Sequence, residues 1–298
     1  MTPELEDIIR DPLTIEELRR PRNKLIMVVG GSDTGKTTLV ECVANLLSKH
    51  SPLGIVDLDM GQSHIGPPAT VAWGKVEGGF PGWSKIGVED FYFTGTTTPF
   101  GSLLPTVSGA ALVTDRALSL CRKVVVDTSG LIAGPVGRIL KQYKIDLLRP
   151  DLVLALERAG ELGHILDAFR SHTRPKILRL PVPDTVRTKT VPKRSLYRFE
   201  KIRKYFSRSR MIEVSLDNLG VRFTSEPSRF SLAGLKNRVV SFRDEKNRDL
   251  ALGIVERIMP GDHRLLIRTP LSADARFSSI VIGKAVIDTA NSLLADKR

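Results

Sequence analysis

The chain has 298 residues, a formal net charge of +12 and an isoelectric point near 9.9, and 41% of its residues are hydrophobic. This length and apolar content allow one large domain or two smaller ones. No stretch approaches the roughly 18 apolar residues of a membrane-spanning helix, and the acidic N-terminal segment lacks the apolar part of a secretory signal. We therefore expect a cytoplasmic protein without membrane contact. Cys42 and Cys121 are too few for a disulfide framework and lack metal-ligand spacing, so we predict buried thiols.

Alternating strand and helix signals run along the chain to about residue 180. Before them, one or two short helices are predicted, with Thr14 as N-cap and Glu17 at the capping-box spacing. The predicted strands are 24–29, 54–59, 91–94, 123–127, 151–156 and 176–180, and the predicted helices are 36–49, 103–121, 135–148 and 160–172. This alternation predicts an α/β fold with a mostly parallel sheet covered by helices on both faces.

The pattern changes from about residue 212, where short strand signals are separated by turns such as DEKN and PGDH. We predict a small β-rich C-terminal module there. The expected division is a short N-terminal helical segment at 1–22, an α/β domain at 23–210 that includes a basic segment at 182–210, and a β-rich domain at 211–298.

The stretch GGSDTGKTT matches the phosphate-binding loop G-x-x-x-x-G-K-[ST], and it lies between a predicted strand and a predicted helix. In such a loop Lys36 reaches the β- and γ-phosphates and the Thr37 hydroxyl ligates Mg²⁺. Asp33 is unusual there: it either orients Lys36 or a metal-bound water, or it only caps the turn. The predicted nucleotide-binding residues are Gly30, Gly31, Ser32, Asp33, Thr34, Gly35, Lys36, Thr37 and Thr38.

Two acids in IVDLDMGQ and one at the end of KVVVD follow or end predicted strands. Asp57 and Asp59 lie two apart on one strand, so we expect both to point toward the carboxyl edge where such sheets bind ligands. A carboxylate there can hold a Mg²⁺ shell or accept a proton from an attacking hydroxyl. Asp59 and Asp127 compete for these two roles. We assign the base to Asp59, which lies nearer the segment GQSHIGPP and its candidate substrate contact, His64.

Positive charge is concentrated between Arg187 and Arg210, where ten Lys and Arg residues accompany a single acid, Glu200. This window supplies +9 of the net +12. Such a patch attracts polyanions, of which nucleic acid is the commonest, although a solvated helix face would look the same in the sequence. Trp73 and Trp83 are interpreted as packing residues rather than as stacking platforms.

Four segments in this order resemble the polynucleotide 5′-hydroxyl kinase family, the RNA kinases of tRNA splicing, pre-mRNA 3′-end processing and ribosomal RNA maturation. They are the loop GGSDTGKTT, the strand and turn VDLDMGQSHIGPPATV, YFTGTTTPFGSLLP and PKRSLYRFEKIRKYF. The third resembles the family's threonine-rich clasp (here residues 92–105), and the fourth lies in the family's arginine-rich lid (here residues 182–210). The resemblance covers about residues 24–210.

The resemblance implies a P-loop NTPase fold and transfer of the γ-phosphate of ATP or GTP, with Mg²⁺, to the 5′-hydroxyl end of RNA or, less expectedly, DNA. It implies that Lys36, Asp59, Arg194 and Arg198 are catalytic, with Arg194 the preferred transition-state arginine. The implied substrate-binding residues are Gln62, His64, Thr97, Thr98, Thr128 and Lys189. The implied Mg²⁺ ligands are Thr37 and Asp59, with Asp127 as a further candidate.

Two departures from the family pattern bear on the substrate. Leu131 stands where the family often has a base-stacking tryptophan, so stacking is absent or supplied elsewhere, and Asp127 stands where many members have asparagine.

The main competing function is a partitioning or insertion-type ATPase switch, which shares the acidic motifs. Lys36 is the only lysine of the loop, whereas such switches carry a second one near its start. A small-molecule kinase would not need ten cations in so short a segment. A catalytically silent RNA-binding scaffold would not need the intact Lys36, Thr37 and Asp59. The sequence names no protein partner.

Overall fold

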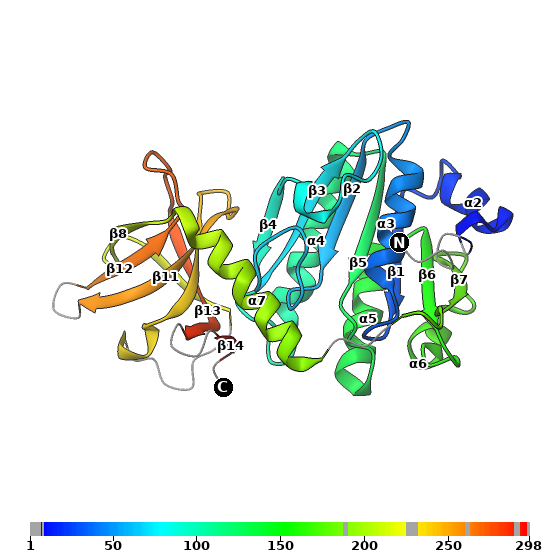
Figure 1. Cartoon of the computed structure of the whole chain (residues 1–298). Helices are drawn as coiled ribbons and strands as arrows, with labels where there is room; N and C mark the ends of the chain where they lie inside the picture. Colours follow the sequence, from blue (N-terminus) through cyan, green and yellow to red (C-terminus); the bar gives the residue numbers. More distant parts are fainter. Residues whose placement is uncertain are drawn as a thin grey trace.

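The computed structural model describes residues 7, 9–186, 190–224, 232–259, 263–288 and 293–296. It contains two seven-stranded sheets, which we call sheet A and sheet B in chain order. Figure 1 shows the two sheets next to each other, with one long helix, α7 (Val191–Tyr205), running between them. The prediction of an α/β P-loop fold with a β-rich C-terminal module is therefore confirmed.

Sheet A has the strand order β4-β3-β2-β5-β1-β6-β7. Its strands are β1 (Leu25–Gly30), β2 (Leu53–Leu58), β3 (Thr70–Val76), β4 (Asp90–Phe93), β5 (Lys123–Thr128), β6 (Leu152–Glu157) and β7 (Lys176–Pro181). Strands β2, β5, β1, β6 and β7 are parallel, whereas β3 and β4 are added antiparallel at one edge. Strand β3 was not predicted, because Gly74 weakens the strand signal. Gly74 is required there, since a Cβ atom would collide with the Gly87 carbonyl.

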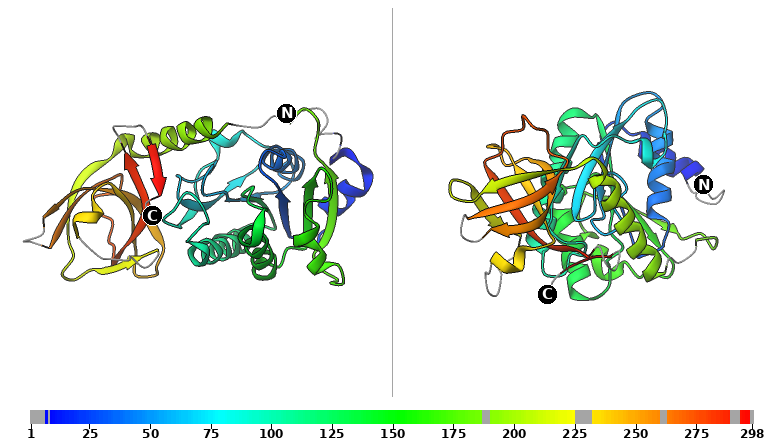
Figure 2. Two further views of the ribbon diagram at one scale, coloured as in Figure 1. Left: turned by 90° about the horizontal axis from the view of Figure 1, so that it is seen from below. Right: turned by 60° about the vertical axis from the view of Figure 1, so that its left-hand side comes forward.

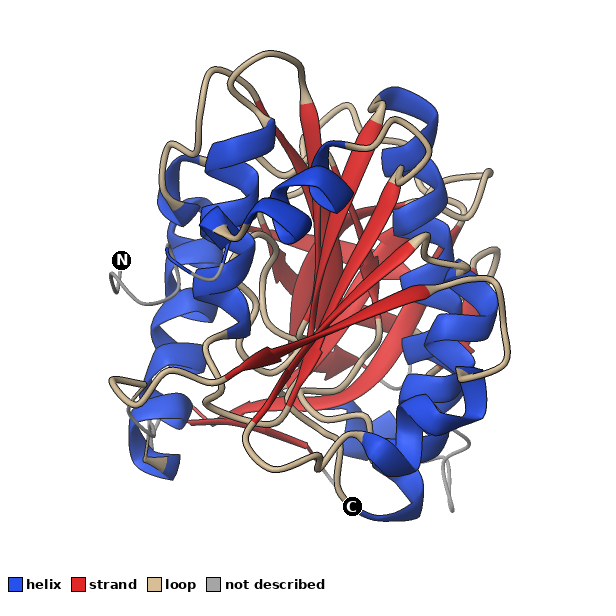
Figure 3. Ribbon diagram, turned by 90° about the vertical axis from the view of Figure 1, so that its right-hand side faces the viewer, coloured by secondary structure: helices blue, strands red, loops and turns tan. Residues whose placement is uncertain are grey.

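Helices cover both faces of sheet A, as predicted (Figures 2 and 3). Alternate residues of β1 divide between the two faces: Ile26 and Val28 belong to the core that includes α3 (Lys36–Leu47), and Met27 and Val29 to the opposite core. The opposite core is closed by α4 (Leu103–Leu120), α5 (Gly134–Leu148) and α6 (Gly163–Leu166). The helix expected at 160–172 is shorter than predicted and consists of α6 and one 3₁₀ turn, Asp167–Phe169. Both cysteines are buried, as predicted.

The N-terminal helix α2 (Pro12–Arg19) begins earlier than predicted. Its N-cap is Asp11 and not Thr14, because Pro12 fits the first helical position and the Asp11 carboxylate accepts hydrogen bonds from the Thr14 amide and hydroxyl, both at 2.9 Å. Glu17 is not part of a capping box. It is buried, and it forms ion pairs with Arg20 at 2.8 Å and Lys176 at 2.9 Å.

Sheet B has the order β14-β13-β10-β11-β12-β8, with β9 pairing parallel to β13. Its strands are β8 (Arg210–Ser215), β9 (Gly220–Phe223), β10 (Arg238–Arg243), β11 (Asp249–Met259), β12 (Arg264–Thr269), β13 (Ser279–Asp288) and β14 (Leu293–Asp296). One face of sheet B has its own core, which includes Phe242 and Ile267. The other face contributes Leu252 to the core that also holds Ile202 and Phe206 at the end of α7. The lid helix is thus packed into the body of the protein.

Sheet B also contacts the β4 edge of sheet A directly. The Phe93 amide donates to the Asp249 carboxylate at 3.0 Å, and Asp249 is paired with Arg243 at 2.8 Å. The Lys284 amide donates to the Gly95 carbonyl at 2.7 Å, which joins β13 to the clasp. Across the residues that the structure describes, no helix combines the length and apolar character needed to cross a membrane.

Phe206 anchors the end of α7, so we predict that Phe206→Ala destabilises the protein strongly. The side chain is only 4% exposed, and emptying such a site costs about 3–5 kcal/mol. The matched control is Leu196→Ala on the same helix, where the side chain is 54% exposed and little change is expected. Urea unfolding measures both free energies of unfolding. An equally small effect of the two substitutions would show that α7 is not fixed by this packing.

Candidate active site

The loop between β1 and α3 has the tight geometry that a phosphate-binding loop needs. Gly35, which precedes α3, has a φ of 87°, and Asp33 has a φ of 53°, so both adopt the left-handed conformation. A Cβ atom at Gly30 would lie 2.7 Å from the Thr34 hydroxyl and 2.9 Å from the Leu156 carbonyl, which only glycine avoids. The loop therefore delivers the chain directly into the N-terminus of α3, where backbone amides and the helix dipole favour an anion.

A cavity of about 300 Å³ lies over this loop and brings together most of the residues singled out in the sequence. The site residues predicted from the sequence that line this cavity are Ser32, Asp33, Thr34, Gly35, Lys36, Thr37, Thr38, Asp59, Gln62, His64 and Thr128. Gly130, Thr185 and Val186 complete the lining and were not predicted. Thr97, Thr98, Arg194 and Arg198 do not line the cavity, and Lys189 lies outside the described residues.

Thr37, which lines the cavity, and Asp127, which is buried and does not line it, form a pair that suits Mg²⁺. The Thr37 hydroxyl donates to Asp127 Oδ2 at 2.7 Å, and Oδ1 of Asp127 is buried with no hydrogen-bond partner in the described part of the chain. Burial and repulsion by Asp57 raise the pKa of Asp127 to about 7, opposed by Lys36 and the Thr37 hydroxyl. An orphaned carboxylate oxygen beside a hydroxyl fits a hard cation, and Mg²⁺ is usually held by one or two protein oxygens together with substrate phosphates.

No group of three or more His, Cys, Asp or Glu residues with metal-binding geometry occurs within the described residues.

Asp57 and Asp59 take different positions, although both were expected to point into the site. Asp57, 1% exposed, accepts hydrogen bonds from the Asp59, His64 and Ile65 amides and from the Ser63 hydroxyl. Burial raises the pKa of Asp57, and these donors oppose the rise. Asp57 therefore shapes the turn.

Asp59 follows the end of β2 and lines the cavity. Its Oδ1 accepts from the Gly61 and Gln62 amides at 3.0 Å each, and these bonds fix the carboxylate. Neither of these amides, nor any other donor of the described residues, bonds to its Oδ2. The orientation leaves Oδ2 for a ligand in the cavity, and Asp59 is the acid of this pair that a substrate can reach.

Lys36 is held inside the loop. Its Nζ donates to the Gly31 carbonyl at 2.5 Å, and the side chain is only 7% exposed. Burial lowers the pKa of Lys36, and the nearby Asp127 and Asp59 carboxylates oppose this shift. An anion in the cavity would favour the charged form in the same way.

Asp33 connects the loop to the lid. Its carboxylate is paired with Arg194 of α7, with 2.5 Å between Oδ2 and Nη2, and its carbonyl accepts from Arg158 at 3.1 Å. The Arg194 and Arg198 Nε atoms are buried and have no hydrogen-bond partner among the described residues. Burial lowers the pKa of Arg198, whereas the charges of Asp296 and Asp59 raise it. Of these two arginines, Arg194 is the one that the lid pairs with the loop.

The clasp is tied to the C-terminal strand. Asp296 of β14 accepts from the Thr96 hydroxyl at 2.7 Å, from the Thr97 amide at 2.9 Å and from the Thr97 hydroxyl at 3.0 Å. The Thr98 carbonyl accepts from the Thr96 hydroxyl at 2.9 Å. The Thr97 carbonyl packs against Gly61, where a Cβ atom would come within 2.8 Å. The clasp therefore borders the Asp59 turn but does not enter the cavity.

Two polar residues near the site were not predicted from the sequence. Arg158 follows β6, which pairs with β1, so the parallel order alone could have placed it next to the loop. Lys141 is fully buried, and its Nζ donates to the Thr128 hydroxyl at 2.8 Å and to the Ser129 carbonyl at 2.5 Å. Burial and repulsion by Lys144 and Lys36 hold the pKa of Lys141 well below its usual value. Its place on the apolar side of α5 was the available signal.

Comparison with known proteins places the chain in a family. The family model described as the mRNA cleavage and polyadenylation factor CLP1 P-loop matches residues 30–208. The chain belongs to this family. A solved structure described as the wild-type Clp1p–Pcf11p (454–563) complex superimposes with a TM-score of 0.73 over 95% of this chain and 79% of that one. With 14% identity, that match shows the shared fold only.

The curated relatives include two archaeal proteins, each named a polyribonucleotide 5′-hydroxyl-kinase. The protein from Pyrococcus abyssi is 38% identical over 215 residues, which are 71% of this chain and 58% of the relative. The protein from Methanocaldococcus jannaschii is 35% identical over 195 residues, or 65% of this chain and 53% of the relative. The chain thus spans a little over half the length of the curated relatives that it matches.

Lys144 is expected to make stability depend on pH. Its Nζ is buried without a hydrogen-bond partner in the described ranges, and burial lowers its pKa from 10.5 to about 8, against the attraction of Asp59 and Asp57. The unfolded chain therefore binds more protons than the folded protein between about pH 8 and 10.5, and the free energy of unfolding rises with pH across this window.

Lys144→Met removes the buried charge and should raise the free energy of unfolding at pH 7 by up to about 3 kcal/mol, while flattening the rise above pH 8. Lys49→Met, at an exposed position, is the control and should change neither quantity. Chemical denaturation from pH 6 to 10.5 measures both. A wild-type profile that stays flat or falls between pH 8 and 10 would contradict the assignment.

Proposed function

We propose that this protein is a polynucleotide 5′-hydroxyl kinase that transfers the γ-phosphate of ATP to the 5′-hydroxyl end of RNA. One observation carries the proposal: a single cavity joins the phosphate loop, the Thr37 hydroxyl and the Asp59 carboxylate, with the buried Asp127 bonded to Thr37 and Arg194 paired with Asp33 of the loop. The names of the archaeal relatives support the same reaction. The partitioning-type ATPase is not supported by these relatives.

In the proposed reaction, the acceptor's 5′-oxygen forms a bond to the γ-phosphorus while the bond to the β–γ bridging oxygen breaks, and ADP leaves. Asp59 orients the hydroxyl and accepts its proton through Oδ2. Lys36 binds the β- and γ-phosphates, and Arg194 stabilises the charge on the transferring group. Thr37 and Asp127, with Asp59, would hold Mg²⁺, which when bound neutralises charge between the phosphates.

The remaining residues receive supporting roles in the proposal. Gln62, His64 and Thr128 line the cavity and are assigned to the acceptor. Arg198, whose pKa is raised by the charge of Asp59, is assigned a second stabilising charge. Thr97 and Thr98 of the clasp are assigned to the phosphates of the acceptor, and Lys189 is assigned to the same RNA strand. In this assignment, the contact of Thr97 with Asp296 is replaced by a contact with the acceptor.

Our division of the chain at residues 22 and 210 also belongs to the proposal. The start of β8 at Arg210 supports the second boundary, because sheet B begins there. In this division, residues 23–210 perform the transfer. Residues 211–298 support the β4 edge, the lid and the clasp.

The test is a transfer assay with γ-labelled ATP, and separately GTP, in the presence of Mg²⁺. The acceptors are short RNA and DNA oligonucleotides that carry either a 5′-hydroxyl or a 5′-phosphate. We expect label only on 5′-hydroxyl ends, with RNA preferred over DNA and with ATP as a donor. Release of free phosphate without labelled oligonucleotide would overturn the proposal and favour an ATPase switch.

Replacing Asp59 by Asn should lower transfer by about 10²-fold or more while nucleotide affinity is kept, because the amide cannot accept the proton. Asp57→Asn is the matched variant. It places an amide donor among four hydrogen-bond donors, so it should lower the free energy of unfolding by about 1–3 kcal/mol. Single-turnover kinetics and urea unfolding separate the two effects. Undiminished transfer by Asp59→Asn would exclude the base role.

Replacing Arg194 by Ala should lower kcat by about 10³-fold and change nucleotide affinity much less, as expected for a charge that acts in the transition state. Arg194→Lys should recover little, because lysine lacks the planar fork of donors. Arg203→Ala, an exposed arginine on the same helix, is the control. If kcat and nucleotide affinity fall by the same factor in Arg194→Ala, the arginine only binds the ground state.

A further inference from the structure

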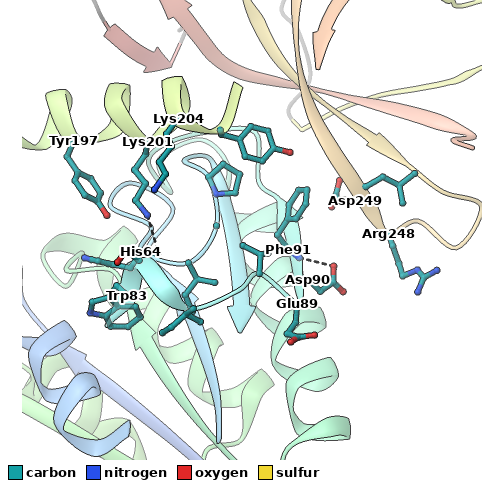
Figure 4. A pocket seen from close by; sticks show the side chains of 18 residues that line it. His64, Trp83, Glu89, Asp90, Phe91, Tyr197, Lys201, Lys204, Arg248 and Asp249 are labelled. Atoms are coloured by element: carbon teal, nitrogen blue, oxygen red, sulfur yellow. Dashed lines mark hydrogen bonds between the residues drawn. The ribbon is translucent and has the colours of Figure 1, made fainter. Parts of the chain in front are cut away.

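A second and larger cavity, of about 1160 Å³, opens beside the first. It lies between the lid helix α7, the turn after β2, the 3₁₀ helix Trp83–Lys85 and the start of β11 (Figure 4). Its volume exceeds the roughly 300–1,000 Å³ of a typical small-molecule pocket, so it can hold more than one nucleotide-sized unit. Nothing in the proposed transfer reaction uses this space.

Aromatic rings gather at the end of this cavity that is nearest the transfer site. The His64 ring lies between Trp83, at 4.9 Å between ring centroids, and Tyr197, at 5.9 Å. Trp83 is held in place, because its Nε1 donates to Glu41 of α3 at 2.5 Å and its ring packs edge-on against Phe80. A ring that is fixed in this way and still half-buried is a ready platform for a flat apolar group. Trp83 also packs against the core, as the sequence suggested.

Cations from the lid overhang the same aromatic end. The lysines Lys201 and Lys204 extend from α7 over the cavity (Figure 4). Lys201 Nζ donates to the His64 carbonyl at 2.8 Å and lies 5.8 Å from the Tyr197 ring centroid, whereas Lys204 is exposed. At the far end, the carboxylates of Asp90 and Asp249 are already paired with Arg116 and Arg243. Negative groups are therefore favoured at the aromatic end.

His64 lines both cavities, so the second cavity adjoins the first at this residue. Fixed rings with lysines above them are the combination by which proteins bind single-stranded nucleic acid, with bases stacked on the rings and phosphates on the cations. We propose that this cavity binds the acceptor RNA downstream of its 5′ end, with a base stacked on Trp83 and the adjoining phosphate on Lys204. This assignment rests on the proposed kinase function, because the direction of the RNA strand follows from placing its 5′ end at the transfer site.

Transfer to acceptors of two lengths tests the site. A dinucleotide fills mainly the transfer site, whereas a hexanucleotide also reaches the second cavity. Wild-type kcat/KM should favour the hexanucleotide, and Trp83→Ala should reduce this preference by about tenfold because stacking on one ring is lost. Tyr143→Ala, at a 60% exposed ring on α5, is the control and should leave the preference unchanged. An unchanged preference in Trp83→Ala, or none in the wild type, overturns the proposal.

A binding measurement that needs no catalysis separates this inference from the kinase proposal. Trp73 is only 2% exposed, so quenching of tryptophan fluorescence by a 5′-hydroxyl hexaribonucleotide should come from Trp83 and disappear in Trp83→Phe. Quenching without any transfer would keep the RNA site and reject the kinase. Transfer without quenching, or quenching that survives in Trp83→Phe, would reject the RNA site, and the cavity would then suit a protein partner.

The salt dependence of RNA binding can be tested with a variant at an exposed position, Lys204→Ala, which does not disturb packing. Lys204→Ala should lower the slope of log affinity against log salt by about 0.7, the value for one phosphate contact on a single strand. Arg203→Ala removes the neighbouring exposed cation, which does not line the cavity, and should leave the slope unchanged. Equal slopes for the wild type and Lys204→Ala would place the phosphates elsewhere.

Discussion

The parallel pairing of β2 and β5 sets two carboxylates side by side in the interior, since Asp57 and Asp127 are register partners. Buried carboxylates are costly unless donors or cations satisfy them. Asp57 is satisfied by the turn that follows it, which thereby acquires the shape that turns Asp59 into the cavity. Asp127 is satisfied only in part, by Thr37. The candidate metal site and the candidate base are thus two consequences of one strand pairing.

A second constraint comes from α7, which packs into the core at one end and contacts the phosphate loop near the other. Its C-terminal end inserts Ile202 and Phe206 into the core shared by sheets A and B, while Arg194, nearer its start, is paired with Asp33 of the phosphate loop. Because the apolar end is fixed, the basic residues of the helix cannot move away from the loop without unpacking that core. Sheet B acts on the transfer site through this helix, and through Asp296 on the clasp.

Local patterns determined what could be predicted from the sequence. The phosphate loop, the five parallel strands and the helices on both faces follow from short-range periodicity and from glycine geometry, and the structure contains them. The antiparallel strand β3 was missed because Gly74 weakens its signal, and the need for glycine there comes from Gly87, in the segment before β4. The Arg158–Asp33 contact and the Thr97–Asp296 contact join residues that lie far apart in the sequence and that no local pattern relates. The two buried lysines of α5 were visible as charges in an apolar stripe, but the bond of Lys141 to Thr128 on β5 was not.

The two cavities differ in the side chains that line them, and the difference fits separate roles in binding the acceptor and in transferring the phosphate. The smaller one is lined by backbone loops, hydroxyls and charges whose positions are fixed by strand ends, which suits the fixed geometry of phosphoryl transfer. The larger one is lined by rings and lysines, which in the RNA site that we propose would bind any base or phosphate of a single strand with little regard to sequence. Since His64 is common to both, a strand held in the larger cavity would bring its end toward Asp59. On this proposal, the lid and the β4 edge would select an acceptor by its single-stranded length, whereas the residues at the strand ends would set the rate of transfer.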